Sequence, residues 1–148
     1  MDPVQVASLL ARRFEGLYLR PYLCPAGVPT IGYGATYYED GSRVQLTDPT
    51  ITKERAEGLL LWMLRTVYLP GVMRLCPGVL DPALLGVLVD FSFNLGLGRL
   101  KSSTLRKKVN LGDRDAVPTE LRKWTIGGGK VLRGLVARRE AEIALLPA

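Results

Sequence analysis

The sequence contains no histidine, and this absence excludes several kinds of active site. Without an imidazole there is no serine or cysteine nucleophile activated by histidine, and the usual zinc sites lose a main ligand. The two cysteines, Cys24 and Cys76, are too few for a disulfide scaffold, and their spacing matches no metal motif. So few cysteines are typical of a reducing compartment, so we expect synthesis in the cytoplasm.

Export signals and long apolar segments are also missing. Residues 1–6 lack the basic start and the unbroken apolar stretch of a signal peptide. The longest apolar run, residues 59–64, is far too short to cross a bilayer. We therefore expect no stable membrane insertion, and another protein must release the chain if it acts outside the cytoplasm.

The length and composition are those of an ordinary globular protein. The chain has 148 residues, enough for one domain, with 47% hydrophobic residues and a net charge of +6. The positive charge favours anionic partners, among them nucleic acid, anionic membrane surfaces and acidic polymers of the bacterial envelope. Because Lys and Arg are dispersed and form no long block, we expect no nucleic-acid partner.

The order of helix and strand signals predicts an α+β fold with two lobes. Asp2-Pro3 begins a helix over about 3–14, and a small β lobe follows over about 17–47, with Asp40-Gly41 as a hairpin turn. A helical lobe fills about 52–146, most simply with a cleft between the lobes. Its predicted helices cover about 52–66, 82–95, 104–110, 116–124 and 135–146, with glycine stretches at 96–98 and 127–129 as breaks.

The segment from Phe14 to Gly34 holds the most informative polar residues. Glu15 ends the first helix beside Phe14 and Leu17, and apolar surroundings favour the protonated form of a carboxylic acid. A protonated acid facing a second polar group across a fold can break a glycosidic bond. The alternative is a solvated glutamate at a helix end.

Residues 30–34 are predicted to form part of this site. Strand alternation places Thr30, Gly32 and Gly34 on one face, which would make a floor for a ligand, and turns Ile31 and Tyr33 into a core.

Glu15, Cys24 and Thr30, with Gly27-Val28-Pro29-Thr30-Ile31-Gly32-Tyr33-Gly34 around them, resemble the phage-type lysozymes of glycoside hydrolase family 24. The resemblance covers nearly the whole chain in the family's order. It continues at Phe91-Ser92-Phe93-Asn94-Leu95-Gly96, at Ser103-Thr104-Leu105, at Trp124 with Gly128-Gly129-Lys130, and at residues 134–142.

This resemblance implies a cofactor-free muramidase with a two-lobed lysozyme fold, cutting between N-acetylmuramic acid and N-acetylglucosamine in peptidoglycan. Glu15 falls on the family's general acid and Thr30 on a hydroxyl that helps to place the attacking water. Gly34, Phe93 and Thr104 match positions along the sugar cleft. The implied protein is a monomeric endolysin that gathers in the host cytoplasm and needs a holin to reach the wall.

Cys24 falls where many relatives carry aspartate, and its role stays open. It could orient water, act as a thiolate base, or attack the anomeric carbon itself; the first two fit inversion and the third retention. It could instead be a buried packing residue, or form an inactivating disulfide with Cys76.

The last predicted helix carries Arg138, Arg139 and Glu142. Arg138 and Glu142 are spaced for a surface pair, i to i+4. The resemblance implies instead that Arg138 or Arg139 approaches Glu15 and influences its protonation. Ala35 stands where some relatives have histidine, so their ion pair is absent. Trp62, Tyr68 and Trp124 are interpreted as packing residues, as is one of Phe91 and Phe93.

Two other functions remain open at this point. A lytic transglycosylase also works with a single catalytic acid, and a wall-binding or basic nucleic-acid-binding protein could keep the fold without catalysis.

Overall fold

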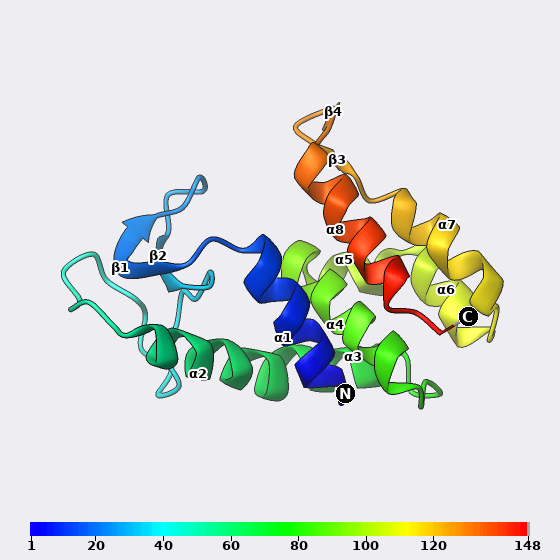
Figure 1. The fold of residues 1–148 in the computed structure, drawn as a ribbon, viewed down its shortest axis with the longest axis horizontal. Coiled ribbons are helices and arrows are strands. Elements are labelled where there is room, and N and C mark those ends of the chain that lie inside the picture. The colour runs from blue at the N-terminus through cyan, green and yellow to red at the C-terminus, as the bar shows by residue number, and fades with distance from the viewer. Residues whose placement is uncertain (148) are drawn as a thin grey trace.

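The computed structural model describes residues 1–147, with a β lobe at one end of a larger helical lobe (Figure 1). Helix α1 (Pro3–Phe14) has the predicted range. The Asp2 carboxylate accepts a hydrogen bond from the Gln5 N–H, and the Gln5 side chain accepts one from the Asp2 N–H, which forms a capping box. The helix lies along helix α4 (Pro82–Leu95) and ends immediately before Glu15.

The β lobe is built on one antiparallel hairpin. Strands β1 (Tyr18–Leu23) and β2 (Pro29–Gly32) pair with Tyr22 opposite Thr30. The predicted turn, at Asp40-Gly41, follows later in the lobe. Gly41 has a φ of +85° there, a value that residues with an L side chain rarely adopt. A small second core fills the lobe and joins it to helix α2 (Lys53–Met63). Its members are Ile31, Ala35, Val44 and Leu59.

A long helical segment follows and departs from the prediction. Helix α2 (Lys53–Met63) continues through the π-helix η1 (Leu64–Tyr68) into α3 (Leu69–Leu75). The predicted end near residue 66 is therefore wrong. Pro70 does not break the path because it lies in the first turn of α3, where its missing N–H is tolerated.

Helix α4 (Pro82–Leu95) is the centre of the helical lobe. Every residue from Leu84 to Ser92 is buried, and Gly96 ends the helix at a φ of +100°. Helix α5 (Leu97–Ser102) starts directly afterwards, so the prediction of a simple break at 96–98 missed a helix.

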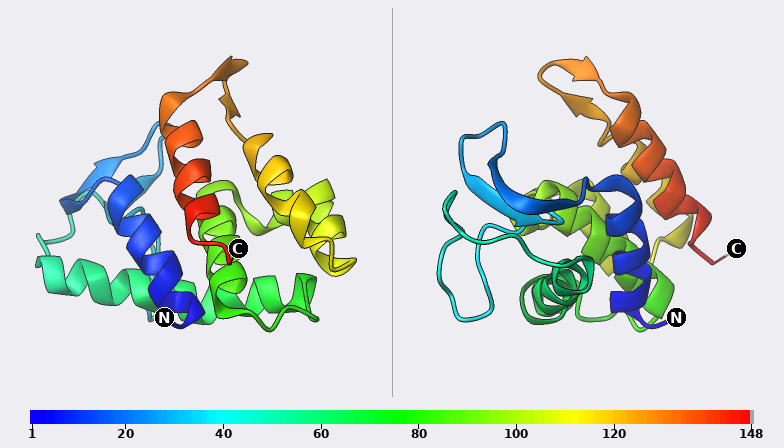
Figure 2. Two further views of the ribbon diagram at one scale, coloured as in Figure 1. Left: turned by 45° about the vertical axis from the view of Figure 1, so that its right-hand side comes forward. Right: turned by 60° about the vertical axis from the view of Figure 1, so that its left-hand side comes forward.

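The rest of the lobe packs around α4 (Figure 2). Helix α6 (Thr104–Asn110) matches its predicted range, and the 3-10 turn η2 (Arg114–Ala116) leads into α7 (Val117–Arg122). The predicted glycine loop is a tight hairpin, β3 (Ile126–Gly127) with β4 (Lys130–Val131). Helix α8 (Arg133–Ala144) then returns beside α1 and α4. No helix within residues 1–147 combines the length and apolar character needed to cross a membrane.

Candidate active site

A cleft of about 560 Å³ lies between the two lobes and carries Glu15 in its wall. Three of the predicted site residues, Glu15, Gly34 and Phe93, line it. Sequence reasoning missed the remaining lining residues, which are Thr36, Tyr37, Trp62, Met63, Val67, Tyr68 and Asn94.

Two aromatic residues interpreted as packing belong to this cleft. Trp62 on α2 and Tyr68 in η1 both line it, so that interpretation is corrected. Tyr68 is the last residue of the π-helix η1, which no hydrophobic pattern in the sequence signalled. Tyr68 contacts Phe93 edge to face, with ring centroids 5.3 Å apart.

The other aromatic assignments agree with the structure. Phe91 is fully buried in the core, whereas Phe93, two positions later on α4, is only half-buried and reaches the cleft. Trp124 packs edge to face on Phe91 with centroids 5.4 Å apart.

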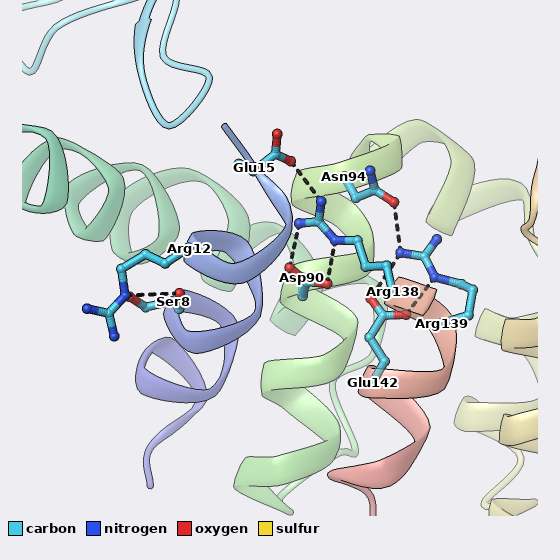
Figure 3. A network of polar contacts seen from close by, with 8 residues as sticks. All are labelled: Ser8, Arg12, Glu15, Asp90, Asn94, Arg138, Arg139 and Glu142. Carbon is cyan, nitrogen blue, oxygen red and sulfur yellow. Dashed lines mark hydrogen bonds and ion pairs between the residues drawn. The ribbon is translucent and has the colours of Figure 1, made fainter. Parts of the chain in front are cut away.

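Glu15 is held by one arginine from the other end of the chain (Figure 3). Arg138 Nη1 lies 2.8 Å from Glu15 Oε1. The same guanidinium donates from Nε and Nη2 to both oxygens of Asp90, at 3.0 and 2.7 Å. Asp90 is fully buried and Arg138 is 3% exposed, whereas the Glu15 side chain is 28% exposed and open to the cleft. Of the two arginines proposed to approach the acid, Arg138 is therefore the one that does.

Arg139 has a different and buried set of partners. Its Nε lies 2.7 Å from Glu142 Oε1, and its Nη2 donates to Asn94 Oδ1 at 2.8 Å. The expected Arg138–Glu142 surface pair is therefore wrong: the i to i+3 pair forms instead, and Arg139 and Glu142 are both fully buried. Burial, followed by the neighbouring Asp90 carboxylate, raises the pKa of Glu142 well above its ordinary value.

Cys24 and Thr30 lie close together on the β1–β2 hairpin, and neither is among the residues that line the cleft. The Thr30 hydroxyl is buried and donates to the Val28 carbonyl at 2.8 Å. Hydrogen bonding from the Val28 backbone lowers the pKa of the Cys24 thiol, with a smaller contribution in the same direction from Thr30. Cys24 is half-buried and Cys76 is buried at the end of α3, and both thiols are free, so the disulfide alternative is not formed.

Two expectations about the cleft, on Gly32 and Thr104, need correction. Gly32 faces helix α2 and not a ligand, because a Cβ built there would lie 3.5 Å from the Ala56 Cβ. Thr104 is exposed at the start of α6 and is not among the residues that line the cleft. Ala35 is fully buried and pairs with Ile31 through backbone hydrogen bonds.

A second groove, of about 370 Å³, lies on another side of the acid. Glu15 and Asn94 line it as they line the first cleft, together with Phe14 and Arg138 and with the start of α8 at Leu132, Gly134 and Leu135. The carboxyl of Glu15 therefore borders both grooves.

Comparison with known proteins places this architecture in a family. Residues 12–142 match the family model described as phage lysozyme. The chain belongs to the phage lysozyme family. This confirms the resemblance drawn from the sequence and the enzyme class that it implied, a glycosidase of the lysozyme type.

Individual relatives agree with this assignment. An endolysin of Bacillus phage B103 is 38% identical over 98% of this chain, which spans only 54% of that protein. An endolysin of Acyrthosiphon pisum secondary endosymbiont phage 1 is 35% identical, covering 93% of this chain and 92% of its own length.

Solved structures confirm the predicted fold class. An endolysin from an Escherichia coli O157:H7 phage, FAHEc1, has a TM-score of 0.83 at 28% identity, covering 98% of this chain and 92% of that one. The muramidase domain of SpmX from Asticaccaulis excentricus has a TM-score of 0.80 at 28% identity, covering 95% and 94%.

Proposed function

We propose that this chain is an endolysin muramidase that hydrolyses the β-1,4 bond between N-acetylmuramic acid and N-acetylglucosamine, with Glu15 as the general acid. The observation that carries the proposal is a carboxyl group exposed to an aromatic-lined cleft and held by one N–H of a buried arginine. A glycan strand fits such a cleft because aromatic rings pack on the apolar faces of sugars and exclude water.

The division of Arg138 between two carboxylates supports this role. Two of its five N–H donors bond Asp90, and a third bonds Glu15 and fixes the position of that side chain. The second carboxyl oxygen, Oε2, is available to carry the proton. In the proposed first step Glu15 gives this proton to the bridging oxygen as the glycosidic bond breaks.

Cys24 and Thr30 supply the second half of the site in this proposal. The thiol has a lowered pKa and the Thr30 hydroxyl lies beside it, so the pair is suited to hold and activate one water molecule. Attack by that water inverts the anomeric configuration. Release of the retained anomer would show instead that the Cys24 thiolate attacks the sugar.

The products distinguish this hydrolase from its alternatives. Digestion of purified peptidoglycan should release reducing N-acetylmuramic acid ends, and Glu15→Gln, which keeps the shape but cannot donate a proton, should lose at least about 100-fold in rate. Ends of the 1,6-anhydro type would mean a lytic transglycosylase. Equal activity of wild type and Glu15→Gln would mean that the acid is not catalytic.

The remaining parts of the proposal concern the setting. The chain acts as a monomer on peptidoglycan after a holin releases it from the host cytoplasm, and its positive charge keeps it near the anionic envelope.

A further inference from the structure

Among residues 1–147, Asn94 and Glu15 are the two that line both grooves. It lies near the end of α4, one turn after Asp90, and its side chain is half-buried. The residue that lines both sides of the acid is placed to contact the sugars on either side of the bond that Glu15 would cleave.

The orientation of this side chain is set by a buried arginine. Arg139 is fully buried, and its Nη2 donates to Asn94 Oδ1 at 2.8 Å and to Glu142 Oε2 at 3.1 Å. A guanidinium only donates hydrogen bonds, so the amide must turn its oxygen toward Arg139. The amide nitrogen, Nδ2, then points away from Arg139 (Figure 3).

The result is a fixed donor beside the acid. Because Oδ1 is turned toward the buried Arg139, the group that Asn94 presents to a ligand is NH₂, which can donate and cannot accept. The sugars of the proposed substrate carry hydroxyls, which both donate and accept, and acetamido groups, whose carbonyl oxygen only accepts. A fixed NH₂ donor therefore suits the acetamido carbonyl oxygen best. That oxygen can only accept a hydrogen bond, whereas a hydroxyl can also donate one to another group.

We propose that Asn94 is a substrate-positioning residue that donates a hydrogen bond from Nδ2 to the acetamido carbonyl of a sugar next to the cleaved bond. This inference rests on the proposed function. It gives the site a preference for N-acetylated sugars, and it assigns the buried Arg139–Glu142 pair the task of holding the donor in place.

The variant Asn94→Asp tests the inference with little change in shape. One carboxylate oxygen keeps the acceptor role toward Arg139, and the other replaces the NH₂ donor with an acceptor. Rates should be measured on intact peptidoglycan and on the same material after de-N-acetylation, where each treated sugar carries an ammonium group. The readout is the ratio of kcat/KM on the two substrates, because any effect of the added carboxylate on Glu15 acts on both rates alike.

The wild type should favour intact peptidoglycan by about tenfold, the range of one hydrogen bond to a neutral group. Asn94→Asp should abolish or reverse that preference. A carboxylate has no hydrogen-bond donor for a carbonyl oxygen, and it attracts an ammonium group. Asn110→Asp is the matched control: it changes the only other asparagine, which is exposed on α6 and donates to the Leu75 carbonyl. Its ratio should equal that of the wild type.

Each outcome separates the two proposals. If the wild type releases reducing ends but Asn94→Asp keeps its substrate ratio, the assignment of Asn94 is wrong and the muramidase proposal stands. If the wild type releases no reducing ends from either substrate, the proposed function itself fails. Thermal unfolding of the three proteins at one pH verifies that Asn94→Asp is folded. If it is not folded, Asn94→Ser replaces it, because the serine hydroxyl can still donate a hydrogen bond. The kcat/KM ratio of Asn94→Ser must then lie between the wild-type ratio and a ratio of one.

Discussion

Cys24 shows how one residue type changes the chemistry expected of a site. An aspartate is ionised throughout the neutral range, whereas an ordinary thiol, with a pKa of about 8.5, is mostly protonated there. Hydrogen bonding from the Val28 backbone lowers the pKa of Cys24, so its thiolate forms at a lower pH than that of a free cysteine. The turn that follows the thiol therefore favours its ionised form.

Substitution at Cys24 tests whether this anion is used. Cys24→Asp should keep substantial activity, and Cys24→Ala should lose about 100-fold, the usual contribution of a general base. Wild-type activity should rise as the thiol ionises and persist further into the alkaline range than that of Cys24→Asp. Release of reducing ends, followed across pH, measures all three. An alanine variant as active as the wild type would mean that the thiol only packs.

The raised pKa of Glu142 predicts that the stability of the fold depends on pH. Burial and the Asp90 carboxylate raise its pKa, while Arg138 and Arg139 act in the opposite direction with smaller effect. The folded state therefore binds a proton more tightly than the unfolded chain does. The stability due to Glu142 is complete below the unfolded pKa of about 4.3, and it is lost as the pH rises through the folded pKa.

Glu142→Gln removes this titration and keeps the neutral shape. From about pH 4.3 upward, the wild type should lose free energy of unfolding relative to the variant, with a slope of at most about 1.4 kcal/mol per pH unit. Urea unfolding at a series of pH values gives the difference between the two proteins. Parallel stability profiles would show that Glu142 is ionised in the folded protein.

At the scale of elements, the close approach of α1 and α4 positions the acid. A Cβ built on Gly86 of α4 would lie 2.4 Å from the Val6 Cβ and 2.9 Å from the Pro3 carbonyl oxygen on α1. Only glycine allows the two helices to lie this close. Because Glu15 directly follows α1, their separation also sets the distance from the acid to Arg138 and Asp90.

Gly86→Ala should force the helices apart and destabilise the protein by about 1–3 kcal/mol, the usual cost of overpacking. Gly58→Ala is the control in α2, where a Cβ would meet no atom within 4 Å; it should stabilise by up to about 1 kcal/mol through helix propensity. Urea unfolding measures both. The argument fails if the two alanine variants change stability in the same direction.

The same scale shows what could be predicted from the sequence. The starts of α1, α4 and α6 could be predicted because each follows a residue that caps helices well. These residues are Asp2, Asp81 and Ser103, and the side chain of each accepts a hydrogen bond from an N–H of the first helical turn. The path from α2 to α3 could not be predicted, since a π-helix has no sequence signal and the apolar pattern indicated a helix only to about residue 66. For the same reason the aromatic wall of the cleft was missed.

In the site, local motifs located Glu15, Gly34 and Phe93 but not the buried partners of Arg138 and Arg139. The Arg138–Asp90 and Arg139–Asn94 contacts join residues 48 and 45 positions apart, and their partners are set by how α8 packs on α4. Spacing within α8 pointed to an Arg138–Glu142 pair because it contains no information about α4. Tertiary packing then assigned each arginine to a different carboxyl group.

At the scale of the whole molecule, Lys and Arg form no long block, but one segment has a local excess of positive charge. The segment 97–112 carries five cations and no acid, in a chain whose net charge is +6. Two of them, Lys101 and Lys107, are exposed beside a groove of about 410 Å³ between α5 and α6. This face lies on the helical lobe, apart from the residues that line the cleft.

Such a face should affect how the protein reaches an anionic wall and not how it cleaves a sugar bond. The double substitution Lys101→Glu with Lys107→Glu should slow digestion of whole sacculi at low salt by about tenfold and leave the rate on small soluble fragments unchanged. Raising the salt concentration should slow the wild type more than the variant, because screening removes the same attraction. Lys53→Glu with Lys130→Glu makes an equal change of net charge at two exposed sites elsewhere, and it should have a clearly smaller effect on sacculi. If the two double variants lose the same rate, net charge and not this face attracts the protein to the wall.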